Sequence, residues 1–152
     1  MGWLIASRWL ALGLLVSTAG HAKDVAPPIG PTEAIAKIDA SRVGHGAYAG
    51  RFEMKVLATG HVGGSVFLNS STDYRAPDDL SLRLLPNVVA AFTKRFGQSP
   101  ETYFIGKHVV VDGTIKRELI VNTDRYFHRV KSLNRWQHSI QIVFANQLIS
   151  VD

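Results

Sequence analysis

The stretch from Arg125 to Trp136 contains the side chains of this chain that are best suited to binding chemistry. It combines fixed positive charges with aromatic rings and has no acidic residue. Cations can follow the backbone of a polyanion while flat rings stack on its bases, so this combination favours an extended anionic ligand. The predicted ligand-binding residues are Arg125, Tyr126, Phe127, Arg129, Lys131, Arg135 and Trp136.

A structural explanation of the same stretch also stands. The rings, together with Val130 and Leu133, would pack a long excursion of the chain onto the domain, and the charges would keep its outer face solvated. The residue types alone do not decide between packing and binding.

No other residues form a recognisable catalytic or metal centre. The histidines after the first 22 residues, which are His45, His61, His108, His128 and His138, include no pair three or four positions apart. The chain has no cysteine, which excludes thiolate metal sites, thiol catalysis, disulfides and a lipid-modified cysteine. We therefore predict no catalytic residues, no metal and no cofactor.

Two polar segments are better explained as turns than as sites. Thr59–Gly64 is rich in glycine but is followed by a strand pattern, so no helix N-terminus is available to cradle a phosphate. Asp73, Asp78 and Asp79 precede a leucine-rich strand, where acids commonly form turns and caps. Their arrangement, with Arg75 beside them, does not supply the acidic metal ligands and arginines of a thermonuclease-like enzyme.

Residues 1–22 have the pattern of an export signal. Arg8 precedes an apolar run, Trp9–Val16, and small residues follow up to Ala22. The run is shorter than the roughly 20 residues that a membrane-spanning helix needs, so we expect cleavage, after Ala22 or alternatively after Ala19. The product would be a soluble periplasmic or secreted protein without a transmembrane segment. Loss of Arg8 leaves 16 basic against 12 acidic side chains, a formal charge of +4.

Residues 23–46 read as a proline-rich linker and a short helix. Thr32 is placed to cap this helix, which would run through Ala40 and lie against one end of the domain. Ile35 and Ile38 give it a narrow apolar stripe.

Residues 47–152 read as one domain of strands with a helix among them. Apolar residues alternate from Arg51 onward, at Ser65–Asn69, at Leu80–Leu85 and at Ser139–Phe144. A further strand contains Val109, Val111, Ile115 and Leu119, with a bulge expected at Gly113. Between the third and fourth strands, Pro86 opens a helix that buries Val88, Phe92 and Phe96, and Gly97 ends it.

The order of three strands, a helix and two strands resembles the OB-fold, a five-stranded barrel with a helix between strands three and four. The run from Gly106 to Ile115 resembles a fourth OB strand. Val66–Ser70, followed by Asp73-Tyr74-Arg75, resembles small exported bacterial OB-fold proteins of uncharacterised function. The similarity covers roughly Ala47–Val151 and carries no chemistry of its own.

The resemblance implies a non-enzymatic binding module, because the loop between OB strands four and five flanks the ligand face and would contain the Arg125–Trp136 stretch. The expected ligand is single-stranded nucleic acid or an anionic glycan. The alternative is a module that binds a protein partner of the cell envelope and has no nucleic-acid role. The oligomeric state does not follow from the sequence.

Overall fold

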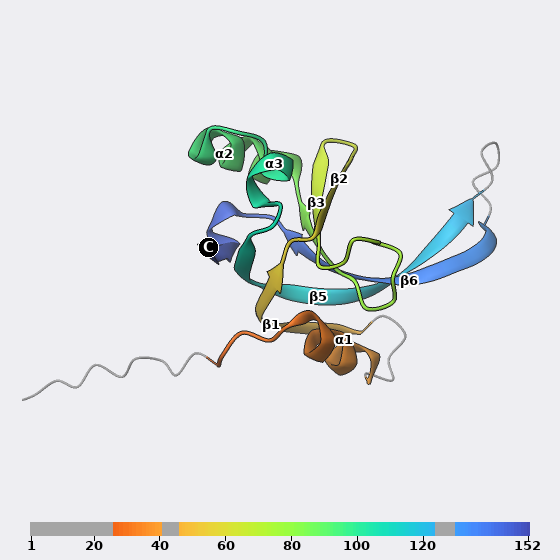
Figure 1. Ribbon diagram of the computed structural model, residues 1–152. Helices are drawn as coiled ribbons and strands as arrows, with labels where there is room; N and C mark the ends of the chain where they lie inside the picture. Colours follow the sequence, from red (N-terminus) through yellow and green to blue (C-terminus); the bar gives the residue numbers. More distant parts are fainter. Residues whose placement is uncertain (1–25, 41–45, 124–129) are drawn as a thin grey trace, which may run out of the picture.

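The computed structural model describes residues 26–40, 46–123 and 130–152. The protein is mainly β, and Figure 1 shows the long β5–β6 hairpin extending well beyond the rest of the molecule. The elements, in chain order, are α1 (Pro31–Asp39), β1 (Ala47–Lys55), β2 (Ala58–Val62), β3 (Ser65–Asn69), β4 (Leu80–Leu84), α2 (Pro86–Phe96), α3 (Pro100–Phe104), β5 (His108–Thr123), β6 (Val130–Ile142), the 3-10 turn η1 (Ala145–Gln147) and β7 (Leu148–Val151).

The strands form one seven-stranded sheet in the order β1-β5-β6-β4-β3-β2, with β7 added beside β5. All neighbours are antiparallel except β4 and β6, which run parallel. β1 and β2 follow each other in the chain but lie at opposite ends of this order. The backbone changes partner between them, since Val56 N donates to Lys107 O at 2.9 Å and Leu57 N donates to Asn69 O at 2.8 Å.

The predicted five strands and single helix are therefore only partly right. No ladder joins β1 to β2 among the described residues, so the sheet is not closed. β2 and β7 are additional strands, α3 is an additional helix, and β6 begins at Val130 rather than Ser139. These elements escaped prediction because they are short or, in β6, because their first residues extend past the core and need no apolar alternation.

α1 forms where the sequence predicts a helix, but Thr32 does not cap it. Pro31 occupies the first turn and Gly30 is the N-cap, because the fixed φ of proline suits a helix start and proline lacks an N–H that needs a partner. Ile35 and Ile38 are buried, as predicted, and α1 packs against β1. Residues 1–22, the predicted export signal, lie outside the described residues.

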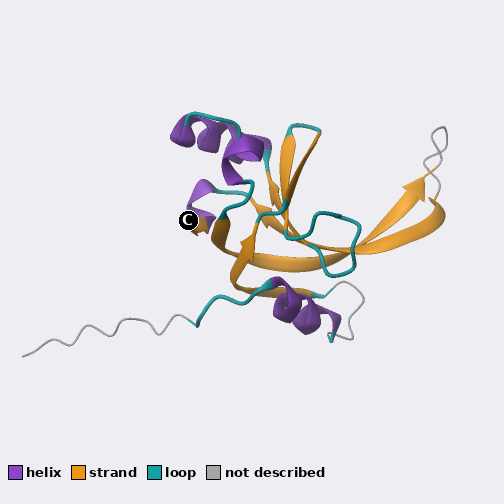
Figure 2. Cartoon of the chain, in the orientation of Figure 1, coloured by secondary structure: helices purple, strands orange, loops and turns teal. Residues whose placement is uncertain are grey.

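α2 begins at Pro86 and ends at Gly97, which has φ 73°, as the sequence predicts. Val88 and Phe92 are buried, whereas Phe96 is half-buried and stacks on Tyr103 of α3 with ring centroids 3.9 Å apart. Figure 2 shows α2 and α3 together at one side of the sheet, away from α1. The two helices thus share an aromatic cluster that covers one end of the core.

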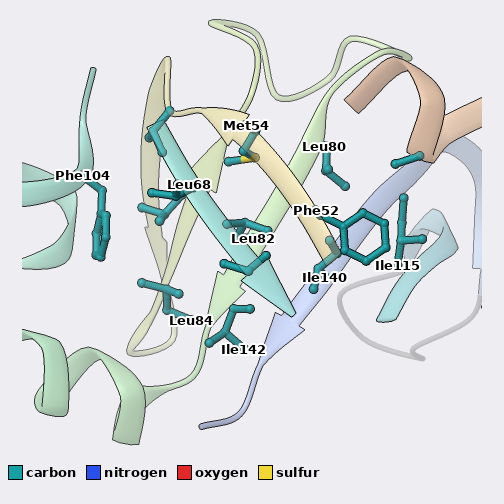
Figure 3. Packing of buried hydrophobic residues seen from close by; sticks show 14 of the residues in the cluster. Phe52, Met54, Leu68, Leu80, Leu82, Leu84, Phe104, Ile115, Ile140 and Ile142 are labelled. Carbon is teal, nitrogen blue, oxygen red and sulfur yellow. The ribbon is translucent and has the colours of Figure 1, made fainter. Parts of the chain in front are cut away.

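The core is built from alternating residues of the central strands (Figure 3). Because side chains alternate along a strand, each of these strands places every second residue in the core and the others on the outer face. The buried set includes Phe52, Met54, Val66, Leu68, Leu80, Leu82, Leu84, Val109, Val111, Ile115, Ile140 and Ile142.

Gly113 does not form the predicted bulge. β1 and β5 pair without a register shift through this position, where Gly50 is opposite Gly113. A Cβ atom at Gly113 would lie 2.5 Å from Cγ2 of the buried Ile140. Glycine is therefore required here by the close approach of a core side chain.

Candidate ligand-binding face

The structure separates the predicted ligand-binding residues into groups. Arg125, Tyr126, Phe127 and Arg129 lie outside the described residues, so their predicted role stays a prediction. Lys131 belongs to β6, although its side chain is also outside the described part. Only Arg135 and Trp136, both in β6, can be placed by their side chains.

Arg135 and Trp136 point to opposite faces of β6, since consecutive residues of a strand alternate. The Arg135 guanidinium lies over the Tyr74 ring, with Cζ 5.2 Å from the ring centroid. Trp136 instead faces the side on which Arg117 of β5 lies, and its ring centroid is 4.4 Å from Arg117 Cζ. One continuous ligand surface cannot include both side chains, so the predicted set is not a single site.

On the Arg135 face, a hollow of about 400 Å³ opens between three parts of the chain. The β2–β3 hairpin forms one wall, the loop 70–79 forms another, and β6 contributes from a third side. Its lining includes Thr59, His61, Phe67, Asn69, Tyr74 and Gln137. These residues combine two aromatic rings with hydroxyl, imidazole and amide groups, which suits a planar, polar ligand group.

Three arginines lie over the two aromatic rings that line this hollow, although none of the three is itself a lining residue. Arg83 Cζ lies 5.8 Å from the Phe67 ring centroid, and Arg75 Cζ lies 4.5 Å from that of Tyr74, which Arg135 also approaches. None of the three forms an ion pair with a carboxylate of the described residues. A ring orients a guanidinium without neutralising it, so its exposed N–H donors stay available to an anion. The Nε of Arg135 is buried and is not one of these donors.

The polar residues of the 70–79 loop fix its shape, as the sequence predicts. Asp73 Oδ1 accepts a hydrogen bond from Arg75 N at 2.9 Å, which positions the segment around Tyr74. Asp79 is 2% exposed and accepts hydrogen bonds from Ser71 N and Ser70 Oγ. Burial raises the pKa of Asp79 above its usual value, although the hydrogen bonds from Ser81, Ser71 and Ser70 oppose this effect.

Below the hollow lies a buried polar cluster that the sequence analysis missed. Ser81 Oγ is 2.9 Å from Asn69 Oδ1 and 2.8 Å from Asp79 Oδ2, and Gln137 Nε2 is 3.5 Å from Ser81 Oγ. A signal was present, because the strict alternation of leucines at Leu80–Leu84 places Ser81 and Arg83 together on the outer face.

His61 connects the hollow to α3. Its Nδ1 lies 3.1 Å from Glu101 Oε1, which ties the β2–β3 hairpin to the start of that helix. Burial alone would raise the pKa of Glu101, but hydrogen bonds from its own backbone N–H, from Ser99 and from His61 lower it overall.

The opposite face carries charges that are already paired. Asp39 Oδ1, at the end of α1, lies 3.0 Å from His138 Nε2 and 3.2 Å from Arg117 Nη1. Burial alone would raise the pKa of Asp39, but these two hydrogen bonds and charges lower it overall. This cluster fastens α1 to β5 and β6. The Arg51 guanidinium is likewise paired, with Asp112 at 2.7 and 2.8 Å.

No family model, curated protein or solved structure matches this chain. Within residues 26–40, 46–123 and 130–152, no helix is long and apolar enough to cross a membrane. The same residues contain no group of three or more histidine, cysteine or acidic side chains that could hold a metal ion. The hollow and its three arginines are therefore the strongest candidate site of the described chain.

Proposed function

We propose that this protein is a non-enzymatic binding module for an extended anionic chain, with single-stranded nucleic acid as its ligand class. The observation that carries this proposal is the placement of Arg75, Arg83 and Arg135 over aromatic rings beside one hollow, without acidic partners among the described residues. Single strands are bound by such combinations, since cations contact phosphates while rings stack on bases.

The strand order supports an OB-fold-like barrel as the frame of this site. β1 and β2 are consecutive in the chain, lie at the two ends of the sheet and exchange partners at Val56–Leu57. One bent strand that contacts both ends of a sheet would bring the sheet close to a barrel. β3 and β4 would then take the place of strands two and three, whose outer face binds the ligand in OB-folds.

We also propose that residues 1–22 are removed on export and that the protein works in the periplasm or outside the cell. The supporting pattern is Arg8, the apolar run and the small residues up to Ala22. Intact-mass measurement of envelope protein should give a chain that starts at Lys23. A cytoplasmic chain that retains Met1 would exclude export.

Binding to oligothymidine across a series of salt concentrations tests the proposed ligand class. Replacing Arg75, Arg83 and Arg135 together by Gln should weaken binding and reduce the slope of log affinity against log salt by about 2, since each phosphate contact on a single strand contributes roughly 0.7. Heparin and polyuronate chains of similar length serve as competing probes. Salt-dependent binding of these glycans, without binding of oligothymidine, would replace nucleic acid by an anionic glycan.

The matched control is the triple substitution of Lys94, Arg95 and Lys107 by Gln. It removes the same charge, and two of its members also lie over rings, with Arg95 Cζ 5.1 Å from Phe96 and Lys107 Nζ 4.9 Å from Tyr103. These residues belong to α2 and the segment after α3, and the rings that they contact, Phe96 and Tyr103, do not line the hollow. Equal losses in the two triple variants would mean that binding follows net charge alone.

A second candidate function is a protein-interaction module, favoured by an exposed apolar pair. Val143 and Phe144 are 36% and 66% exposed and border a second hollow of about 420 Å³. If the parent protein binds no polyanion, Phe144→Ser should reduce the capture of envelope proteins. Unchanged capture would remove this surface as the interface.

A further inference from the structure

Asp79, Ser81 and Asn69 form a hydrogen-bonded chain that leads from the buried end of the loop 70–79 to the hollow. The three residues are 2%, 0% and 4% exposed. Ser81 Oγ lies within hydrogen-bond distance of both Asn69 Oδ1 and Asp79 Oδ2. A hydroxyl has one proton, so it cannot donate to both oxygens at once. One of the two neighbours must therefore supply a proton to Ser81.

Protonated Asp79 satisfies every group in the arrangement seen in the structure. Asp79 Oδ1 accepts from Ser71 N at 2.9 Å and Ser70 Oγ at 3.4 Å, which leaves Oδ2 as the oxygen that carries the proton. Oδ2 donates to Ser81, and Ser81 donates to Asn69 Oδ1. Because this oxygen is engaged, Asn69 has its amide N–H groups left to offer to the hollow that it lines.

With ionised Asp79 the same groups are also satisfied, but each hydrogen bond runs in the opposite direction. The carboxylate can only accept, so Ser81 donates to Asp79. The Asn69 side-chain amide then flips by about 180°, so that Oδ1 and Nδ2 exchange places and Nδ2 donates to Ser81 Oγ. In this state Asn69 has its carbonyl oxygen left for the hollow.

We propose that Asp79, Ser81 and Asn69 act as a proton relay that determines whether the hollow offers its ligand a hydrogen-bond donor or an acceptor. Asn69 is the residue that contacts the ligand, and Asp79 and Ser81 are positioning residues that act through it. The ligand preference of the relay rests on the proposed binding function, whereas the coupling between Asp79 and Asn69 does not.

The surroundings of Asp79 favour its protonated form. Burial raises the pKa of Asp79, and no charged side chain is among the causes of the shift. The charged groups of the neighbouring elements are Arg75, Asp73 and Asp78 on the loop, Arg83 on β4, Arg135 and His138 on β6, and Lys116 and Glu118 on β5, in register with Ser139 and Gln137. His138 points to the other face toward Asp39, and the remaining groups are exposed except for the half-buried Arg135. Solvent screens exposed charges, so burial dominates.

Thymine and cytosine are suitable probes because their edges differ in the required way. Thymine presents an acceptor, O4, where cytosine presents a donor, the N4 amino group. Protonated Asp79 should therefore favour thymine, and ionised Asp79 should favour cytosine. The ratio of the two affinities reports the state of Asn69.

The first experiment needs no ligand and follows the parent protein by NMR through a pH titration. The Asp79 carboxyl carbon and the Asn69 side-chain amide should change with one common midpoint. In Ser81→Ala the Asp79 carboxyl should still titrate, while the Asn69 amide should no longer follow it. Asn69 signals that stay constant through the Asp79 titration of the parent would overturn the relay.

The second experiment compares oligothymidine with oligocytidine of equal length on either side of the Asp79 midpoint. The ratio of affinities should change about fivefold in the parent, the effect of one exchanged hydrogen bond. In Asp79→Asn the ratio should change only as far as cytosine itself is protonated, because an amide at this position donates to Ser81 at every pH. The fivefold change of the parent is therefore measured relative to this variant, in which the protonation of cytosine acts equally.

The outcomes separate the relay from the proposed function. If neither oligonucleotide binds, the proposed ligand class fails, and the NMR titration alone decides whether the coupling exists. If both bind and the parent ratio changes with pH no more than the ratio in Asp79→Asn, the relay has no role in recognition. Should Asp79→Asn not fold, Ser81→Ala provides the same comparison, and a parent-like change of the ratio in that variant would overturn the proposal.

Discussion

Two sets of arginines on the same sheet differ in what holds them. Arg51 and Arg117 each form an ion pair, with Asp112 and Asp39 respectively, and Arg117 also lies over Trp136. Arg83 and Arg135 lie over the rings of Phe67 and Tyr74 and have no acidic partner among the described residues. An acid that pairs with a guanidinium occupies its donors, while a ring leaves them available. The comparison teaches that the partner of a charge, more than its presence, distinguishes an attachment point from a binding surface.

The largest expected effect is on the free energy of unfolding, and it tests the packed core beneath the sheet that carries both groups of arginines. Phe92 is 1% exposed and contacts Phe96 and Phe104, with ring centroids 5.6 and 5.5 Å away. Phe92→Ala should lower the free energy of unfolding by about 3 to 5 kcal/mol, because it removes buried surface and leaves a cavity. Denaturant unfolding measures this loss.

Val62→Ala is the control for that variant, since Val62 is 68% exposed and a surface substitution changes stability by roughly 0.5 kcal/mol or less. Similar losses in the two variants would show that α2 does not support the sheet as described.

A ring should matter for binding only where it lines the hollow and holds an arginine that has no acidic partner among the described residues. Tyr74→Ala should weaken oligothymidine binding by about 1 to 3 kcal/mol, the usual range for a lost base stack. Tyr48→Ala is the matched control, because Tyr48 is similarly exposed and has Lys37 Nζ 5.6 Å from its ring centroid, yet lies on β1. Titration of fluorescent oligothymidine measures both. A loss for Tyr48→Ala as large as that for Tyr74→Ala would remove the distinction between the two regions.

The ion pair between Asp39 and Arg117 should make the free energy of unfolding depend on pH. The pKa of Asp39 is below its ordinary value of 3.8 in the folded protein, so its contribution is present above that pH and is lost as the pH falls through the lowered value. Asp39→Asn should therefore be less stable than the parent above pH 3.8, and the difference should shrink below it. Urea unfolding at a series of pH values measures the difference, and a constant difference would assign Asp39 another role.

The smallest expected effect is on oligothymidine affinity when Arg51 loses its carboxylate partner. Asp112→Asn removes the charge partner of Arg51 but provides neither a hollow nor a ring. Oligothymidine affinity should therefore stay within about twofold of the parent, the change expected from one added long-range charge at physiological salt. A gain as large as the loss caused by Tyr74→Ala would mean that any unpaired arginine suffices.

The sequence predicted the parts of the fold that depend on local patterns. The alternating leucines of Leu80–Leu84 and the Pro86-to-Gly97 helix with buried Val88 and Phe92 were all correct. α3 and β2 were missed because each is five residues long and neither has a strong apolar period. The turn predicted at Thr59–Gly64 is confined to Gly63 and Gly64, which have positive φ, because Thr59–Val62 belong to β2 and pair with β3.

The candidate site could not be predicted as a whole, because its residues come together only through strand register. Phe67 is opposite Arg83, and Ser81 is opposite both Asn69 and Ser139, across two ladders that no local pattern specifies. The predicted stretch contributed Arg135 to this face and Trp136 to the other. A charged, aromatic run therefore indicated the region, but the alternation of β6 divided it.

The most direct test of the difference between the two sets is NMR of the arginine side chains during titration with oligothymidine. Each Nε–H group gives its own signal, so ring-held and paired guanidiniums can be observed in one experiment. The signals of Arg75, Arg83 and Arg135 should shift together as the oligonucleotide is added, while those of Arg51 and Arg117 should stay in place. Shifts confined to Arg51 and Arg117, or equal shifts in both sets, would contradict the assignment of the ligand face.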